Sequence, residues 1–201
     1  MTARLSSPAE PPEPDPRGVL LRILGIDPGS LVTGYGVVER SGADVRHVAH
    51  GTLRPARGAT LPARLAAIHE GVCRVIAAHR PDTVVVEQVF VASNARAALV
   101  LGHARGVALA AASAAGLAVE ELSPQDVKRA VAGNGAAEKG QVQRMVQRLL
   151  ALDSAPARDA ADALAAALCR AHRGRLAARG PRARRPRARR AAGGFVLRRA
   201  P

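Results

Sequence analysis

The spacing of hydrophobic positions divides the central part of the chain into strands and helices. Residues 19–27, VLLRILGID, form a nearly continuous apolar run, which is typical of a strand buried on both faces. Two shorter runs, at 34–40 and 46–54, are joined by glycine-containing turns and predict two further strands. The folded part of the chain is therefore expected to begin with a β-meander.

After this meander the apolar positions change to helical spacing. Over residues 61–79 they recur every three or four positions, which predicts an amphipathic helix, and residues 81–89 return to the pattern of a buried strand. A face of small residues, mostly alanine, predicts a second helix over about 92–115, and residues 116–123 indicate a fifth strand. Strands and helices thus alternate through the middle of the chain.

The last part of the pattern is helical. Ser123, Pro124 and Asp126 form a helix-start signature, with an N-cap residue, a proline at the first helical position and an acid in the first turn. Two more helices are expected near 138–151 and 157–172. The order βββαβαβααα predicts an α/β domain, with a mixed sheet of about five strands and helices on both faces.

Composition separates this domain from two extensions. Residues 1–17 are rich in proline and acids, and residues 173–201 in arginine, proline, glycine and alanine. Both are predicted to be disordered, which assigns the folded domain to residues 18–172. The final segment carries +11 and the first −1 of a net charge of +14, so +4 remains for the domain. This basic excess favours a polyanionic partner.

Neither a membrane nor an oxidising compartment is indicated. There is no run of about 18 consecutive apolar residues and no apolar core of a signal peptide at the start, so we expect no membrane span and a cytoplasmic location. Cys73 and Cys169 both fall in apolar helical patterns. They are interpreted as reduced thiols in or near the core.

Four acids occupy positions that otherwise favour apolar side chains. Asp27 ends the first strand, Glu87 ends the strand TVVVE, and Asp159 and Asp162 lie in the helix ARDAADALAAAL. Each acid alone also fits a structural role: a charge at a helix N-terminus for Asp159, a strand end for Glu87, an ion pair for Asp162. Together they can converge if the last helix packs across the carboxyl ends of the strands.

Converging carboxylates repel one another unless cations lie between them. Mg²⁺ takes oxygen ligands at about 2.0–2.1 Å. Two such ions about 3.5–4 Å apart can activate a water and stabilise the leaving oxygen in a phosphodiester displacement. The acids therefore indicate a two-metal site for phosphodiester hydrolysis, with Mg²⁺ as the cofactor and Mn²⁺ as a substitute.

Four stretches of the sequence resemble one known family. They are ILGIDPGSLVTGYGVV, VVVEQVFVASNARAALVLGHARG, SPQDVKRAVAGNGAAEKGQVQRMV and DAADALAAAL. In order and approximate spacing they are similar to the RuvC family of crossover junction endodeoxyribonucleases, which resolve Holliday junctions. The resemblance covers roughly residues 22–172 and is far more specific than any single short motif.

This resemblance implies an RNase H-like fold, a homodimer and Mg²⁺-dependent symmetrical nicking of two strands of a four-way DNA junction in recombination and repair. The nicks would leave 5′-phosphate and 3′-hydroxyl ends. It also implies that Asp27 bridges two metal ions, that Glu87 holds one beside the attacking water, and that Asp159 and Asp162 complete the coordination. The implied protein partners are the branch-migration proteins RuvA and RuvB.

The resemblance extends to basic and aromatic residues. Lys128 and Lys139 match family lysines near the scissile phosphate, and they are the only lysines beside 28 arginines. Phe90 is expected to stack against an unpaired base at the junction centre. Arg96 and Arg105 are expected to contact phosphates.

The chain also departs from the family pattern. Ser93 stands where a basic residue is common, which removes an expected phosphate contact, and Cys169 and Arg170 stand where threonine and histidine are often found. His172 is interpreted as a surface residue at a helix end. The arginine-rich tail has no counterpart, and it either strengthens nonspecific, salt-sensitive DNA binding or keeps the protein soluble.

Three other functions are compatible with parts of the sequence. An actin-like or sugar-kinase-like ATPase shares the loop GIDPGSLVTGYG but needs a second phosphate loop in a duplicated domain, for which about 150 core residues are too few. A noncatalytic junction-binding scaffold would not need the four carboxylates. A related nuclease acting on RNA or transposon ends would keep them, whereas Phe90, Lys128 and Lys139 favour a junction resolvase.

Overall fold

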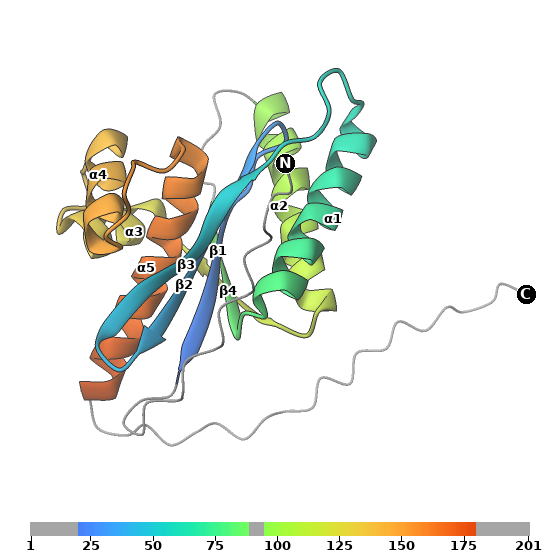
Figure 1. Cartoon of the computed structure of the whole chain (residues 1–201). Helices are drawn as coiled ribbons and strands as arrows, with labels where there is room; N and C mark the ends of the chain where they lie inside the picture. The colour runs from blue at the N-terminus through green and yellow to red at the C-terminus, as the bar shows by residue number, and fades with distance from the viewer. Residues whose placement is uncertain (1–19, 89–94, 180–201) are drawn as a thin grey trace, which may run out of the picture.

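Five strands and five helices follow one another in the predicted order within residues 20–88 and 95–179, the part of the chain that the computed structural model describes (Figure 1). The strands are β1 (Leu21–Asp27), β2 (Thr33–Ser41), β3 (Asp44–Leu53), β4 (Thr83–Glu87) and β5 (Ala118–Leu122). The helices are α1 (Leu61–His79), α2 (Ala95–Ala114), α3 (Pro124–Ala132), α4 (Lys139–Leu149) and α5 (Arg158–Arg179). The predicted α/β class with helices on both faces of a five-stranded mixed sheet is confirmed.

The strand order in the sheet is β3-β2-β1-β4-β5. β1 and β2 pair antiparallel, as do β2 and β3, whereas β1, β4 and β5 run parallel. Ile26 pairs with Val86 in the register of β1 and β4, so the next residues along the two strands are Asp27 and Glu87. Parallel strands end at the same edge of a sheet, and this register brings the two acids to that edge together.

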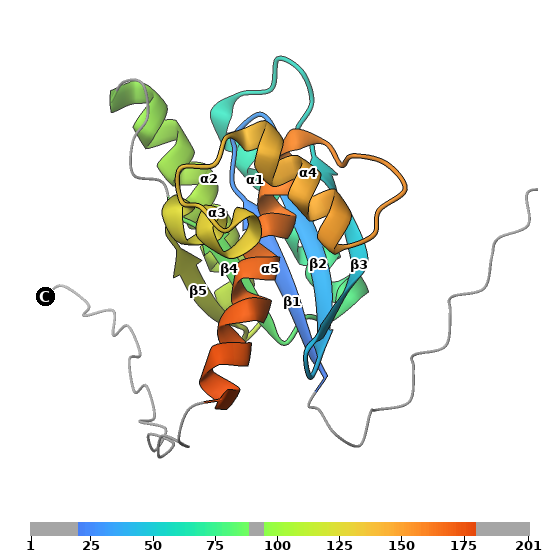
Figure 2. The same ribbon diagram turned by 90° about the vertical axis from the view of Figure 1, so that its left-hand side faces the viewer.

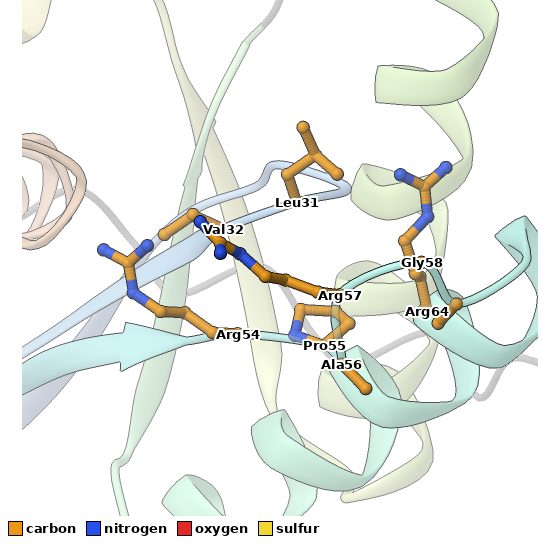
Figure 3. Close-up of a pocket in the computed structure, with 9 residues that line it drawn as sticks. Leu31, Val32, Arg54, Pro55, Ala56, Arg57, Gly58 and Arg64 are labelled. Atoms are coloured by element: carbon orange, nitrogen blue, oxygen red, sulfur yellow. The ribbon is translucent and has the colours of Figure 1, made fainter.

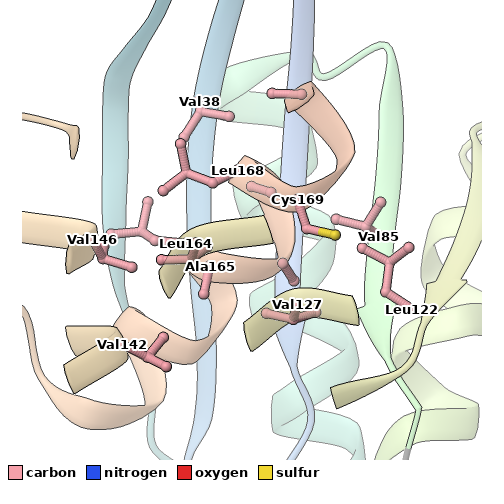
Figure 4. Close-up of a cluster of buried hydrophobic side chains, with 14 of the residues drawn as sticks. Val38, Val85, Leu122, Val127, Val142, Val146, Leu164, Ala165, Leu168 and Cys169 are labelled. Carbon is pink, nitrogen blue, oxygen red and sulfur yellow. The ribbon is translucent and has the colours of Figure 1, made fainter. Parts of the chain in front are cut away.

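Each face of the sheet supports a separate layer of helices. Because side chains alternate across a strand, Leu24 and Ile26 of β1 face α1 and α2, whereas Ile23 faces the layer of α3, α4 and α5. Figure 2 shows α5 lying along the sheet, with α3 and α4 outside it. The side chains of this second layer include Val127, Val142, Val146, Leu164 and Leu168 (Figure 4).

Three glycines let α5 lie directly against the sheet. A methyl group at Gly25 of β1 would lie 2.0 Å from the carbonyl oxygen of Ala163, and one at Gly36 of β2 would lie 2.6 Å from the Leu164 side chain. At Gly34 the nearest atom would be the carbonyl oxygen of Asp159, at 2.0 Å. Strand and helix backbones are thus in contact along this line, and glycine is the residue that permits it.

Helix α5 is buried on nearly all sides over its first three turns. The buried residues are Ala160, Ala161, Ala163, Leu164, Ala165, Ala166, Ala167, Leu168, Cys169 and Ala171. The sheet covers one side of the helix, and α3 and α4 cover the other (Figure 4). The abundance of alanine therefore reflects a helix packed closely between two layers, where larger side chains would overfill the space.

The end of α5 differs from the prediction. The helix continues past residue 172 to Arg179, so the predicted domain boundary falls inside it. Arg173 lies 3.1 Å from a carboxylate oxygen of Glu120 on β5 and 2.9 Å from one of Asp126 on α3. These ion pairs join the helix to its neighbours beyond the apolar pattern from which its end was predicted.

The predicted start of α3 is confirmed. The Ser123 side chain accepts a hydrogen bond of 3.1 Å from the backbone N–H of Asp126, and Pro124 occupies the first turn. The helix ends at Gly133, whose φ of 73° lies in the left-handed region. Both ends of this short helix, which carries Lys128, are therefore capped.

A buried carboxylate connects the three antiparallel strands. Glu39 on β2 accepts hydrogen bonds from Arg22 on β1, at 3.1 and 2.6 Å, and from Arg46 on β3, at 2.6 Å. Burial by itself would raise the pKa of Glu39, but the hydrogen bonds from both arginines lower it below its usual value. This paired charge fixes the register of the meander.

The two cysteines have different environments. Cys169 is buried, as predicted, and its thiol lies 3.6 Å from the carbonyl oxygen of Asp126. Cys73 is exposed on α1, so the prediction of a core thiol is wrong at this position. The apolar periodicity of α1 places Val72 and Val75 inside, and Cys73 lies between them on the outer side of the helix.

Helix α2 is long and apolar enough to cross a membrane, by length and composition alone. In this fold one of its faces, with Ala104, Ala108, Ala111 and Ala112, is buried against α1 and the sheet. The remaining residues are exposed or half-buried and mostly small or apolar, with Leu99 at 66% exposure, although Arg96 and His103 are also exposed. The helix has no long continuous run of apolar residues, because Arg96, His103 and Arg105 interrupt it.

The glycine contact gives a direct test of the packing. We expect Gly25→Ala to destabilise the protein by several kcal/mol, because the new methyl group meets the backbone of α5 and neither backbone can move without disturbing the core. Urea unfolding followed by circular dichroism measures this change. Gly140→Ala on α4 is the matched control, since its methyl group would meet nothing closer than the Arg144 side chain at 3.6 Å. Equal stability of both variants would contradict the packing argument.

Candidate active site

Asp27 and Glu87 are the last residues of two neighbouring parallel strands. Gly25 and Val85, two residues earlier on each strand, face α5, so the alternation of side chains directs both acids to the same face. Asp27 also pairs with Gly34 of β2, where the carbonyl of Asp159 approaches the strand. The end of β1 thus lies under the beginning of α5.

Asp159 and Asp162 are carried by the first turns of α5, three residues apart and therefore on one side of the helix. The close contact at Gly34 fixes the height of Asp159 above the sheet. Side chains near a helix N-terminus also benefit from its positive end, which favours carboxylates there. The predicted convergence of strand-end acids with a helical pair is observed.

The acids act strongly on one another. Burial raises the pKa of Asp27 from 3.8 to about 7, and repulsion by Asp162, Glu87 and Asp159 adds to it. Burial, followed by repulsion from Asp162, also raises the pKa of Glu87. For Asp162 burial is again the largest cause of a raised pKa, although Lys139 opposes it. Asp27 lies at the centre of the group, because all three other acids raise its pKa.

Two lysines offset part of this charge. Lys139, the first residue of α4, places its Nζ 3.6 Å from Oδ2 of Asp162 and lowers the pKa of Asp27, Glu87 and Asp162. Lys128 on α3 lowers the pKa of Glu87. Both lysines line a small cavity of about 40 Å³ that also exposes Glu87 and Asp162. The predicted acids and lysines therefore share one site.

This site suits a hard cation. Its donors are carboxylate oxygens, the ligands that Mg²⁺ prefers, and their mutual repulsion is the electrostatic condition that a divalent ion relieves. Among the described residues, no three His, Cys, Asp or Glu side chains are already arranged as a coordination shell. The Lys139 ammonium is the positive charge that pairs with Asp162.

The other predicted contact residues lie elsewhere. Phe90 and Ser93 fall outside the described residues. Arg96 is exposed in the first turn of α2. Arg105 forms an ion pair with Glu121 of β5, so it already has an acidic partner within the fold.

Arg170 and His172 connect α5 to its neighbours. Arg170 lies 2.8 Å from a carboxylate oxygen of Glu120, and His172 lies within 3.3 Å of the carbonyl oxygen of Ala130 on α3. His172 is half-buried, so its interpretation as a surface residue is only partly right. These contacts, which helical periodicity does not predict, hold α3 and hence Lys128 in position beside the acids.

A mixed sheet in this strand order, with acids at the ends of its two central strands and on a helix packed across them, defines an RNase H-like nuclease. The sequence model of the family "Crossover junction endodeoxyribonuclease RuvC" matches residues 23–170. The chain belongs to the RuvC family. Family membership decides against the ATPase alternative.

Named relatives support the assignment. The crossover junction endodeoxyribonuclease RuvC of Halorhodospira halophila is 58% identical over 153 residues, which cover 76% of this chain and 91% of the relative. That of Alkalilimnicola ehrlichii is 53% identical over 158 residues, covering 79% and 95%. Most of each relative is therefore matched, and the unmatched part of this chain lies mainly outside residues 23–170.

Solved structures agree with the fold. RuvC of T. thermophilus, in complex with a Holliday junction substrate, superposes with a TM-score of 0.72 at 35% identity, covering 78% of this chain and 96% of that one. The yeast mitochondrial Holliday junction resolvase Ydc2 superposes with a TM-score of 0.56 at 14% identity, covering 80% and 86%. The second likeness is one of fold alone.

The raised pKa of Asp27 predicts a pH-dependent stability in metal-free buffer. Between about pH 4 and pH 7 the folded protein keeps a proton on Asp27 that the unfolded chain releases, so the contribution of Asp27 to stability is largest at low pH and falls as pH rises toward 7. Asp27→Asn removes this loss. We expect the variant to gain about 1–3 kcal/mol relative to the parent on going from pH 5 to pH 8.

Urea unfolding in EDTA at the two pH values measures this difference. Asp153→Asn, at an exposed position between α4 and α5, is the control and should behave like the parent at both. A gain for Asp27→Asn that is the same at pH 5 and pH 8 would show that the carboxylate is not held protonated by its neighbours.

Proposed function

We propose that this chain resolves Holliday junctions by paired nicks, with a metal-dependent active site formed by Asp27, Glu87, Asp159 and Asp162. The observation that carries the proposal is the convergence of these acids: burial, and then repulsion by Asp162, Glu87 and Asp159, raises the pKa of Asp27 to about 7. Acids that oppose one another's ionisation are unfavourable for folding. In a member of a nuclease family, their role at a catalytic site accounts for them.

The cofactor we assign is Mg²⁺, two ions per site, for which Mn²⁺ can substitute. Asp27 is the residue expected to contact both ions, since the other three acids all raise its pKa. Glu87 would hold one ion on the strand side, and Asp159 and Asp162 would complete the site from α5. When bound, the ions supply an activated water and charge stabilisation for in-line hydrolysis. The expected products carry 5′-phosphate and 3′-hydroxyl ends.

The lysines have a separate role in this proposal. Without metal, Lys139 offsets the charge of Asp162 from 3.6 Å away. A bound cation would take over that task, and the Lys139 ammonium would then be available to a phosphate oxygen of the substrate. Lys128, in the same cavity, would hold a second phosphate oxygen. Both are positive charges at the point where negative charge develops.

Junction recognition is assigned to three further residues. The T. thermophilus relative was solved with a Holliday junction substrate, and we infer the same class of substrate for this chain. Phe90 is assigned to stack on an unpaired base and Arg96 to contact a phosphate. Arg105 must leave its ion pair with Glu121 to take the same role.

Paired nicks need two active sites, and we infer a homodimer joined through α2. The exposed side of this helix is, apart from one histidine, a continuous stripe of small or apolar residues at helical spacing. Its members are Leu99, Gly102, His103, Gly106, Ala110 and Ser113. Such a face favours close packing against a second helix, because few side-chain atoms separate the two backbones. RuvA and RuvB as partners, and a cytoplasmic location, complete the proposal.

A nicking assay tests the function. On a synthetic four-way junction with Mg²⁺ we expect two symmetrical nicks, and none with EDTA, on linear duplex or on an RNA–DNA hybrid. Glu87→Gln should lower kcat at least about 100-fold, and Lys139→Gln about 10- to 100-fold, because both act on the reacting phosphate. Asp153→Asn, outside the site, should cut like the parent. An intact junction beside a cut hybrid would overturn the proposal.

The dimer interface has its own test. We expect Leu99→Glu to shift the protein from dimer to monomer in analytical ultracentrifugation, because it replaces the large apolar side chain of the stripe with a charge. Leu149→Glu, at a leucine with 41% exposure on α4, is the matched control and should stay dimeric. A Leu99→Glu protein that remains a dimer would exclude α2 as the interface.

A further inference from the structure

We propose that a second basic site, formed by Arg54, Arg57 and Arg64, binds a backbone phosphate of a DNA arm away from the cleavage point. The inference rests on the proposed function and extends it, because it assigns part of the junction contact to a surface outside the carboxylate site. It starts from a cavity of about 420 Å³ between the β1–β2 turn and the segment that joins β3 to α1.

The three arginines surround this cavity from different elements (Figure 3). Arg54 follows the last residue of β3, Arg57 lies in the loop after it, and Arg64 lies in the first turns of α1. Leu31 and Val32, from the turn after β1, form an apolar wall among them. Residues distant in sequence thus contribute to one basic hollow.

The charge of this site is not offset by the protein. Neither Asp nor Glu lines the cavity, and within the described residues none of the three arginines forms an ion pair. The Nε of Arg64 is buried without a hydrogen-bond partner. Arg54 has one weak contact, from its Nε to Oγ1 of Thr52 at 3.3 Å. A guanidinium has five N–H donors, so most of their hydrogen-bonding capacity is free.

Several other arginines of the same domain are paired with acids. On α1 itself Arg74 lies beside Glu70, and Arg22 and Arg46 both bind Glu39. These arginines form ion pairs that stabilise the fold. Three unpaired guanidiniums around one cavity instead provide the fork-shaped donors that match phosphate oxygens.

The wall of the cavity is held in a fixed shape. The Thr33 hydroxyl donates a hydrogen bond of 2.8 Å to the carbonyl of Gly29, which closes the turn that carries Leu31 and Val32. The same turn begins directly after Asp27, at the end of β1. The site is therefore connected to the catalytic edge by one short, closed turn.

Position and polarity favour a DNA backbone as the occupant. Thr33, the first residue of β2, pairs with Leu53, the last residue of β3. Arg54 therefore lies at the same edge of the sheet as Asp27, the last residue of β1. A strand bound at the carboxylates can continue along that edge toward the arginines. Leu31, at 68% exposure, offers an apolar surface to a deoxyribose beside the bound phosphate. A free phosphate or mononucleotide shares the chemistry but has no second point of attachment.

The salt dependence of junction binding tests the site. Binding is measured without cleavage, in EDTA, for the full chain and for the Arg54→Gln/Arg57→Gln double variant and Arg64→Gln. We expect the double variant to bind about tenfold more weakly near 0.1 M salt and to lose about one unit of slope in log K against log salt for each lost phosphate contact. Arg74→Gln, also on α1, should leave both unchanged. Thermal melting shows whether each variant is folded.

Replacing single phosphates of the DNA by uncharged linkages locates the phosphate that the arginines bind. Single methylphosphonates are placed along one arm, and the position that weakens binding of the parent should have no further effect in the double variant. Competition by a mononucleotide at millimolar concentration should not reproduce the loss. Unchanged slope in both arginine variants, or a methylphosphonate effect that adds fully to theirs, would overturn the proposal.

The nicking rate distinguishes a role of the three arginines in DNA binding from a role in catalysis. At saturating enzyme the arginine variants should nick the junction within about twofold of the parent, because the site contributes to binding and not to the reacting phosphate. If the parent does not nick junctions at all, the proposed function fails, and the slope measured on linear duplex still tests the phosphate site. A variant that binds normally but cuts slowly would contradict the assigned role.

Discussion

The contact between α5 and the sheet is the constraint on which the rest of this structure depends. Gly25, Gly34 and Gly36 leave no side chain between strand and helix, so backbone atoms meet backbone atoms along the line of contact. A helix held this closely cannot slide or rotate without a clash. Its acids, in the first turns, therefore have a fixed position above the end of β1, which is the accuracy that a catalytic group of carboxylates needs.

The electrostatics of the site run against the stability of the fold. Burial and mutual repulsion raise the pKa of Asp27 to about 7, and Lys139 offsets only part of the effect. The buried Glu39 is in the opposite situation. Burial would raise its pKa, but two arginines lower it, and these ion pairs contribute to folding. One domain thus contains a carboxylate paired with two arginines and a group of carboxylates whose charge Lys139 offsets only in part, and the difference is the supply of guanidinium groups within hydrogen-bond distance.

Positive charge is distributed by role. The two lysines accompany the acids, where an ammonium acts as a compact, mobile charge, whereas arginines perform the structural pairing. Arg170 and Arg173 form ion pairs that join α5 to β5 and α3. These pairs help to hold α3, which carries Lys128, in position. Arg54, Arg57 and Arg64 surround a cavity and have no acidic partner within the part of the chain that the structure describes. The net charge of +14 is therefore not a uniform field.

The sequence by itself determined the order of elements and the class of fold, because alternation and helical spacing record burial along the chain. Its apolar pattern singled out the four acids, and the resemblance to the RuvC family added the two lysines. The tertiary structure decided what depends on contacts between distant residues: the exposure of Cys73, the extension of α5 to Arg179, and the pairing of Arg105 with Glu121. It also brought together the three cavity arginines, which come from a strand end, a loop and a helix. Periodicity reports which side of an element is covered, whereas packing alone determines which residues face one another across it.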